Sequence, residues 1–135
     1  HIIAPLSNGN FSDMLYLARY AHLPWDIILG ASISGFYKPH ASTYRMSCEV
    51  LRLPPESVCM VAAHQVDLAF AAGHGMQTAF VPRPMEFGGA TRARDASRDQ
   101  PSLDAAEVYA EGDWTYIATD FIDLAGQLEA DAHSP

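Results

Sequence analysis

Short apolar runs alternate along this chain with stretches in which apolar residues recur every three or four positions. The short runs are typical of buried strands, and the wider spacing is typical of helices that bury one face. The predicted strands cover residues 2–7, 26–31, 57–63, 78–81 and 115–118. The predicted helices cover residues 12–21, 42–51, 66–72 and 121–128. Ser12 is expected to cap the first helix, and the chain is expected to fray from residue 130. This alternation predicts an α/β domain with a mostly parallel sheet and flanking helices.

Residues 85–113 break the alternation, because they are rich in glycine, alanine, arginine, aspartate and serine. We expect an exposed excursion there, with a helical piece near residues 103–109. The excursion is too short to be a domain of its own, so the sequence predicts one domain over residues 1–135.

The composition narrows the classes of function. Hydrophobic residues make up 49% of the chain, which is enough to bury a core. Sixteen acidic against eight basic residues give a net charge of −8, which disfavours binding to a nucleic acid backbone. No apolar stretch reaches the roughly 18 residues that span a membrane. Cys48 and Cys59 fall in a predicted helix and a predicted strand, where buried thiols suit a reducing compartment such as the cytoplasm.

Polar side chains follow three of the predicted strands. They are Ser7, Asn8 and Gly9 after the first strand, Lys38 in the loop after the second, and His64, Gln65 and Asp67 after the third. Ligands of parallel α/β sheets bind beyond the carboxyl ends of the strands. A hydroxyl, an ammonium and a carboxylate that converge there would hold an anionic substrate and position a nucleophile or a water.

Each of these residues also has a purely structural interpretation. Residues 7–9 form a common turn sequence, and Lys38 before Pro39 is often a solvated charge. Asp67 suits the first turn of a helix whatever the function, and His64 can simply cap that helix. Tyr44 lies on a helical stripe that is more often core than catalyst. No spacing of ligands predicts a metal site, and no glycine pattern predicts a dinucleotide site.

Five segments taken in order resemble the haloacid dehalogenase superfamily, and the type II 2-haloacid dehalogenases in particular. They are LSNG (6–9), YKP (37–39), Tyr44, VAAHQVD (61–67) and GMQTAFVPRP (75–84). The resemblance covers most of residues 1–128. It implies a Rossmann-like core domain and a hydrolase that removes halide from a small 2-haloalkanoic acid without a metal cofactor. In this family an aspartate attacks the carbon that bears the halogen, and water hydrolyses the resulting ester.

The resemblance also implies roles for individual residues. Ser7 and Asn8 would hold the substrate carboxylate and stabilise the leaving halide. Lys38 would pair with the nucleophile and keep it ionised, and Tyr44 would line the site beside it. Asp67 would orient Lys38 or the hydrolytic water.

The sequence departs from the family pattern in two places. Ala62 and His64 stand where such dehalogenases often have serine and asparagine, so His64 or Gln65 would have to supply the polar group that positions the water. No strand in this chain ends in the family's nucleophilic aspartate. We therefore expect the nucleophile, its strand and the cap domain to lie outside the chain, which would be the C-terminal part of a core domain. The absent strand would lie between the first and third predicted strands and leave both with open edges.

Two other functions remain open from the sequence. One is a phosphatase-like hydrolase of the same fold, with magnesium near Asp67. The other is a catalytically silent module that binds a partner through residues 85–113. The expected partners of the dehalogenase are a small anionic haloacid and, because the family is often dimeric, a second copy of the protein.

Overall fold

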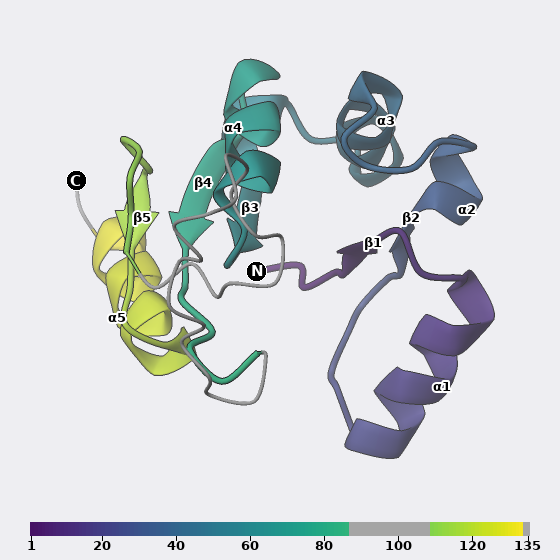
Figure 1. The fold of residues 1–135 in the computed structure, drawn as a ribbon, viewed down its shortest axis with the longest axis horizontal. Helices are drawn as coiled ribbons and strands as arrows, with labels where there is room; N and C mark the ends of the chain where they lie inside the picture. Colours follow the sequence, from purple (N-terminus) through teal and green to yellow (C-terminus); the bar gives the residue numbers. More distant parts are fainter. Residues whose placement is uncertain (87–108, 134–135) are drawn as a thin grey trace, which may run out of the picture. The chain divides into compact units, whose positions relative to one another are not determined.

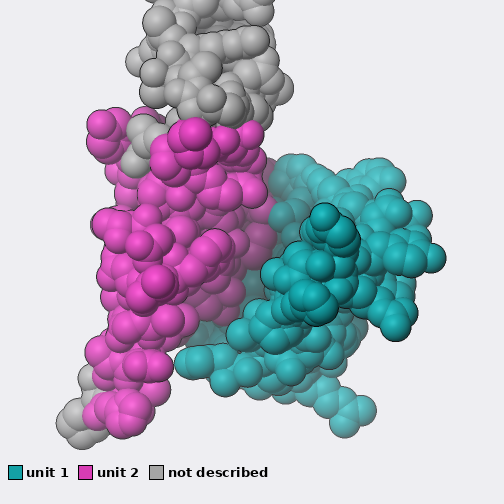
Figure 2. All heavy atoms as spheres, turned by 90° about the horizontal axis from the view of Figure 1, so that it is seen from below, with its two compact units in different colours: residues 1–58, 73–76 teal, residues 59–72, 77–135 magenta. Residues whose placement is uncertain are grey.

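The computed structural model describes residues 1–86 and 109–133. The chain divides into two compact units, which Figure 2 shows in teal and magenta. Unit 1 comprises residues 1–58 and 73–76, and unit 2 comprises residues 59–72 and 77–135. Each unit combines parallel strands with helices (Figure 1), which confirms the predicted α/β class.

Unit 1 is built on a short pair of parallel strands, in which Leu6 lies opposite Leu29 and Ser7 lies opposite Gly30. Its elements are β1 (Leu6–Ser7), α1 (Phe11–Ala21), β2 (Leu29–Gly30), α2 (Ala31–Ser34), α3 (Ala41–Leu51) and the 3-10 helix Pro55–Ser57. The stripe predicted for α3 does face inward, because Tyr44 and Cys48 are both buried. α3 therefore packs as the pattern of apolar positions predicts.

Three local predictions for unit 1 were wrong. The first two strands are only two residues long, although Asp26 N–H donates to the Ile3 carbonyl and continues the pairing outward. Pro5 has no N–H to give to a regular ladder, which shortens β1. Asn10 caps α1 in place of Ser12, because its side chain accepts a hydrogen bond from the Ser12 N–H. The four-residue helix α2 was not predicted.

Unit 2 contains a three-stranded parallel sheet in the order β3–β4–β5. Its elements are β3 (Cys59–Ala62), α4 (Gln65–Gly73), β4 (Gln77–Phe80), β5 (Tyr116–Ile117) and α5 (Phe121–Ala132). A core cluster of Ala79, Val81, Ala118 and Leu124 joins β4, β5 and α5. The Asp120 carboxylate caps the start of α5 through the N–H groups of Ile122 and Asp123. At its other end the helix runs to Ala132 and does not fray at residue 130, because the Tyr116 hydroxyl donates to Asp131 and the His133 N–H donates to the Ala130 carbonyl.

The described strands form two sheets, and β1 and β3 each lie at the edge of their sheet. β1 pairs only with β2, and β3 pairs only with β4, among the residues that the structure describes. The second edge of β1 and of β3 thus has no described partner. Most of the predicted helical piece at 103–109 lies outside the described residues, and Tyr109, which is described, is not helical.

Within residues 1–86 and 109–133, every helix is too short or too polar to cross a membrane.

Candidate active site

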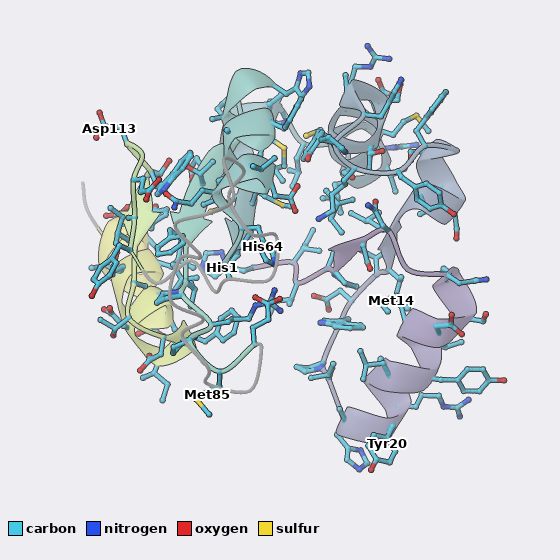
Figure 3. The ribbon with its side chains drawn as sticks, viewed as in Figure 1. His1, Met14, Tyr20, His64, Met85 and Asp113 are labelled. Atoms are coloured by element: carbon cyan, nitrogen blue, oxygen red, sulfur yellow. The ribbon has the colours of Figure 1, made fainter. Side chains whose placement is uncertain are left out.

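The turn after β1 is closed by its own side chains. The Ser7 hydroxyl accepts a hydrogen bond from the Gly9 N–H at 2.9 Å. A methyl group at Gly9 would lie 3.0 Å from the end of the Met14 side chain and 3.1 Å from the Ser7 hydroxyl oxygen. Met14, which is labelled in Figure 3, comes from α1. A side chain at position 9 would therefore require the end of Met14 and the Ser7 hydroxyl to shift by a few tenths of an ångström.

The side-chain amide of Asn8 binds the backbone of Lys38 twice. Asn8 Oδ1 accepts from the Lys38 N–H at 2.6 Å, and Asn8 Nδ2 donates to the Lys38 carbonyl at 3.1 Å. The two residues are 30 positions apart in the sequence. The predicted site residues Asn8 and Lys38 are therefore in direct contact. Lys38 is half-buried and is the only lysine in the chain.

The loop that carries Lys38 is also held from α3. The Thr43 hydroxyl, which is 1% exposed, donates to the Phe36 carbonyl at 2.8 Å. The rings of Phe36 and His40 stack with their centroids 4.0 Å apart. Contacts at Phe36 and at His40 thus hold the loop before and after Lys38.

Gly30 lets the ends of β1 and β2 approach each other. Its φ is +145°, and a methyl group there would lie 2.0 Å from the Ser7 carbonyl oxygen. Any side chain would push the two strands apart, because that distance is far inside van der Waals contact. The absence of a side chain at Gly30 therefore sets the positions of Ser7 and Asn8.

A small pocket of about 290 Å³ opens beside this turn. It is lined by Asn8, Gly9, Asn10, Ala31, Ser32, Gly35, Phe36 and Tyr37. The lining belongs entirely to unit 1 and combines amide, hydroxyl and aromatic groups. Its size and polarity suit a small polar ligand.

Tyr44 and Cys48 are buried, and Cys59 is half-buried against the core cluster of unit 2. Tyr44 is fully buried, and its ring lies 5.7 Å from that of His74. Burial raises the pKa of Cys48, and burial raises the pKa of Cys59 to about 11. Both are therefore protonated thiols near neutral pH, which makes them poor nucleophiles.

In unit 2, His64 follows β3 (Figure 3) and forms a polar cluster with two residues that follow β4. His64 Nε2 lies 3.1 Å from Glu86 Oε1, and the Arg83 guanidinium donates to the same oxygen at 2.6 Å. Glu86 is the least exposed of the three, with 20% of its side chain accessible. Arg83 and Glu86 were missed as candidate site residues, although the position of Arg83 just after a predicted strand was a usable signal.

Gln65 at the start of α4 binds the segment that leads into β5. Its Oε1 accepts from the Glu111 N–H and, at 3.2 Å, from the Trp114 indole, and its Nε2 donates to the Tyr109 carbonyl. Trp114 was also missed, since a contact 49 residues away leaves no local pattern. Gln65 thus ties this segment to α4.

Asp67 lies in the first turn of α4 and is half-buried, and its N–H donates to the His64 carbonyl at 3.1 Å. His64, Gln65 and Asp67 are therefore gathered at one helix start. In the part of the chain that the structure describes, no three histidine, cysteine, aspartate or glutamate side chains form a group that could hold a metal ion.

Polar side chains thus gather in each unit after the carboxyl ends of parallel strands, which is where α/β proteins bind their ligands. The fold defines the class as an α/β protein, and the strand ends hold its candidate ligand site. The family model described as HAD-hydrolase-like matches residues 36–111, more than half of the chain, and the chain belongs to that family.

Known relatives agree with this assignment. The chain is 34% identical over 87 residues to (S)-2-haloacid dehalogenase 4A of Burkholderia cepacia, which covers 62% of this chain and 37% of the relative. It is similar to the crystal structure of an L-2-haloacid dehalogenase, with 43% identity and a TM-score of 0.80 over 94% of this chain and 49% of that one. A defluorinating L-2-haloacid dehalogenase gives 40% identity and a TM-score of 0.80 over 96% and 47%. The chain therefore spans half or less of the length of these relatives.

Proposed function

We propose that the protein is a hydrolase that removes halide from a small 2-haloalkanoic acid, and that this chain carries part of its active site. One observation carries the proposal: two L-2-haloacid dehalogenases are 40–43% identical to the chain over nearly its whole length. The loop of Lys38 also supports the proposal, because its backbone is held by hydrogen bonds from Asn8 and Thr43. A positive charge at a fixed place stabilises an attacking carboxylate and an anionic haloacid.

In the proposed reaction, an aspartate carboxylate attacks carbon 2 of the haloacid. A carbon–oxygen bond forms as the carbon–halogen bond breaks, and the halide leaves with the bonding electrons. Water then cleaves the ester, which gives the 2-hydroxy acid, releases a proton and regenerates the carboxylate. We place this aspartate outside the chain, on a further strand of the core. This placement is supported by the second edges of β1 and of β3, which have no partner among the described residues.

The residues of the chain would share the remaining tasks. The Lys38 ammonium would keep the attacking carboxylate ionised by its opposite charge. Ser7 would hold the substrate carboxylate, and Tyr44 would form the wall behind Lys38. His64 and Asp67 would position the hydrolytic water at the start of α4, where helix N–H groups favour negative charge. Gln65 would support this helix start by its contacts with Tyr109, Glu111 and Trp114.

Halide release by the complete protein tests the proposal. We expect chloride from 2-chloropropanoic acid in a buffer with a metal chelator, and a loss of at least about a hundredfold in kcat for Lys38→Ala. Lys38→Arg is the matched variant, because it keeps the charge and changes its geometry. Turnover only of phosphate esters, and only with magnesium, would favour the phosphatase alternative, whereas no turnover of either substrate would leave a silent binding module.

We also propose a cytoplasmic location and, because proteins of this family are often dimeric, a homodimer. Two free cysteines in the described structure support a reducing compartment. Sedimentation of the complete protein at several concentrations tests the dimer: a single monomeric species throughout would contradict it.

A further inference from the structure

We propose that Glu86 is a positioning residue for His64: its carboxylate holds the His64 ring in one orientation and in one tautomer, in which Nε2 carries the proton. This inference rests on the proposed function, in which His64 positions the hydrolytic water. It adds to that site a residue that follows a different strand, β4. Glu86 acts through His64 and not on the substrate.

The pairing of β3 with β4 brings the two segments together. Ala62 lies opposite Phe80 at the end of the ladder, and the Val81 N–H donates to the Ala62 carbonyl at 3.1 Å. The chain therefore leaves the two strands side by side, once towards His64 and once towards Glu86. The contact between these two side chains follows from the register of the sheet.

A turn after β4 presents the Glu86 carboxylate to His64. The Glu86 N–H donates to the Arg83 carbonyl at 3.0 Å, and the Arg83 guanidinium donates to Glu86 Oε1 at 2.6 Å. The exposed fraction of the side chain is 20% for Glu86, against 44% for His64 and 53% for Arg83. Arg83 thus holds the carboxylate that His64 contacts.

The contact of Nε2 with the carboxylate decides the tautomer of His64. Glu86 Oε1 lies 3.1 Å from His64 Nε2. An ionised carboxylate only accepts hydrogen bonds, so Nε2 supplies the proton. The Arg83 guanidinium, 3.2 Å from the same nitrogen, does not reverse this, because its shorter contact is with Glu86 itself. In the neutral ring the acceptor is then Nδ1.

The direction of the ring decides what His64 can do for a water. The His64 carbonyl accepts from the Asp67 N–H at 3.1 Å, which holds the backbone at the start of α4. Two rotatable bonds separate this backbone from the ring, and the contact with Glu86 restrains both. Attack on an ester requires the water to point a lone pair at the carbonyl carbon, and the groups that accept its hydrogens set that direction.

The two steps of the reaction in the complete protein measure the effect. Glu86→Ala should slow the hydrolysis of the covalent ester roughly three- to thirtyfold, whereas the first release of halide should stay within about twofold of the wild type. Rapid quenching and mass spectrometry count the ester, and the initial burst of halide reports the first step. Unchanged ester hydrolysis, or equal slowing of both steps, would overturn the inference.

A double-mutant cycle shows whether Glu86 acts through the histidine. In His64→Asn, the acceptor is an amide oxygen, which needs no tautomer to be set. Glu86→Ala should therefore change ester hydrolysis by less than about twofold in this background, and equally little in His64→Ala. Losses that multiply in these backgrounds would contradict a positioning role.

Glu86→Gln separates the contact from the charge. The glutamine keeps an oxygen that accepts from Nε2 and loses the negative charge, so its rate of ester hydrolysis should lie between those of the wild type and Glu86→Ala. A carboxylate that acted directly on an anionic substrate would repel it. In that case both variants would lower KM, which would overturn the inference.

Glu49→Ala is the matched control for the loss of a glutamate. Glu49 in α3 also pairs with an arginine, Arg45, at 3.7 Å in an exposed position. The control variant should keep both rates of the wild type, because exposed ion pairs contribute little. Slowing of ester hydrolysis equal to that in Glu86→Ala would assign the effect to net charge and contradict the inference.

NMR spectroscopy tests the orientation without any turnover. In the wild type, the couplings of the His64 β-protons should report one rotamer, and the nitrogen shifts of the ring should report the Nε2–H tautomer. In Glu86→Ala the couplings should be averaged over several rotamers. Unchanged couplings in this variant would overturn the inference even in an active enzyme. A wild type that releases no halide from 2-chloropropanoic acid would overturn the proposed function instead.

Discussion

Two side-chain amides, those of Asn8 and Gln65, shape the surroundings of the candidate site at the scale of single residues. Each binds a backbone segment that is 30 or more positions away in the sequence. An amide is suited to this because it supplies a donor and an acceptor in one plane.

Replacing Gln65 by alanine should loosen the segment before β5. The Glu111 N–H and the Trp114 indole lose their acceptor, which costs about 1 kcal/mol because both partners are partly exposed. Amide exchange at Glu111 should become faster, and the Trp114 indole signal should shift in NMR spectra. Gln127→Ala is the matched control, because Gln127 in α5 also donates to a backbone carbonyl. A Gln65→Ala spectrum identical to that of the control variant would contradict the prediction.

The pair Tyr116–Asp131 should make stability depend on alkaline pH. The hydrogen bond that the Tyr116 hydroxyl donates to Asp131, followed by burial, raises the pKa of Tyr116 to about 12. Because the folded pKa lies above the ordinary value near 10, the contribution of the pair is complete below about pH 10 and is lost as the pH rises towards 12.

The measurement compares wild type and Tyr116→Phe in urea at two pH values. The wild type should be more stable at pH 8, by about 1 kcal/mol or less, since the bond is exposed. The difference should shrink at pH 11. A difference that is the same at both pH values would show that the hydroxyl is not the titrating group.

At the scale of elements, the pairing of β1 with β2 depends on Gly30. Gly30→Ala should lower the free energy of unfolding by at least about 2 kcal/mol, because the new methyl group would meet the Ser7 carbonyl. Gly126→Ala is the control in α5, where a methyl group meets nothing within 4 Å. It should stabilise the protein by roughly 0.5–1 kcal/mol. Urea midpoints that move in the same direction would refute this pair of predictions.

How well an element could be predicted depends on where its stabilisation comes from. α3 was predicted to within one residue, because its apolar stripe and its ends are local features of the sequence. β1 and β2 were predicted too long, because strand pairing depends on a partner and Pro5 interrupts it. The expectation that ligands bind beyond the carboxyl ends of parallel strands singled out Lys38, His64 and Gln65 as candidates. The hydrogen bonds of Asn8 and Gln65 to distant backbone could not be predicted, because they follow no periodic pattern in the sequence.

At the scale of the whole molecule, the edges of β1 and β3 that have no partner within residues 1–86 and 109–133 lead to a prediction about the proposed additional strand. In the 135-residue chain alone, amides of these strands that do not donate to β2 or β4 should exchange almost as fast as in an unfolded peptide. In the complete protein they should exchange at least about tenfold more slowly, because added strand pairing protects backbone N–H groups at an edge. Equal rates in both would argue against a strand at this place. The interior amides of β4, which pairs on both sides, are the internal reference.

Because Lys38 is the only lysine among the 135 residues, the loop that Asn8 clamps also carries the only side-chain amine of the chain. Reagents that acylate amines therefore have one side-chain target here, and it lies in the candidate site. Coupling the protein to an activated surface through this residue would attach it by the very group that the proposed chemistry needs. Attachment through an engineered cysteine on the exposed face of α5 would leave that group untouched.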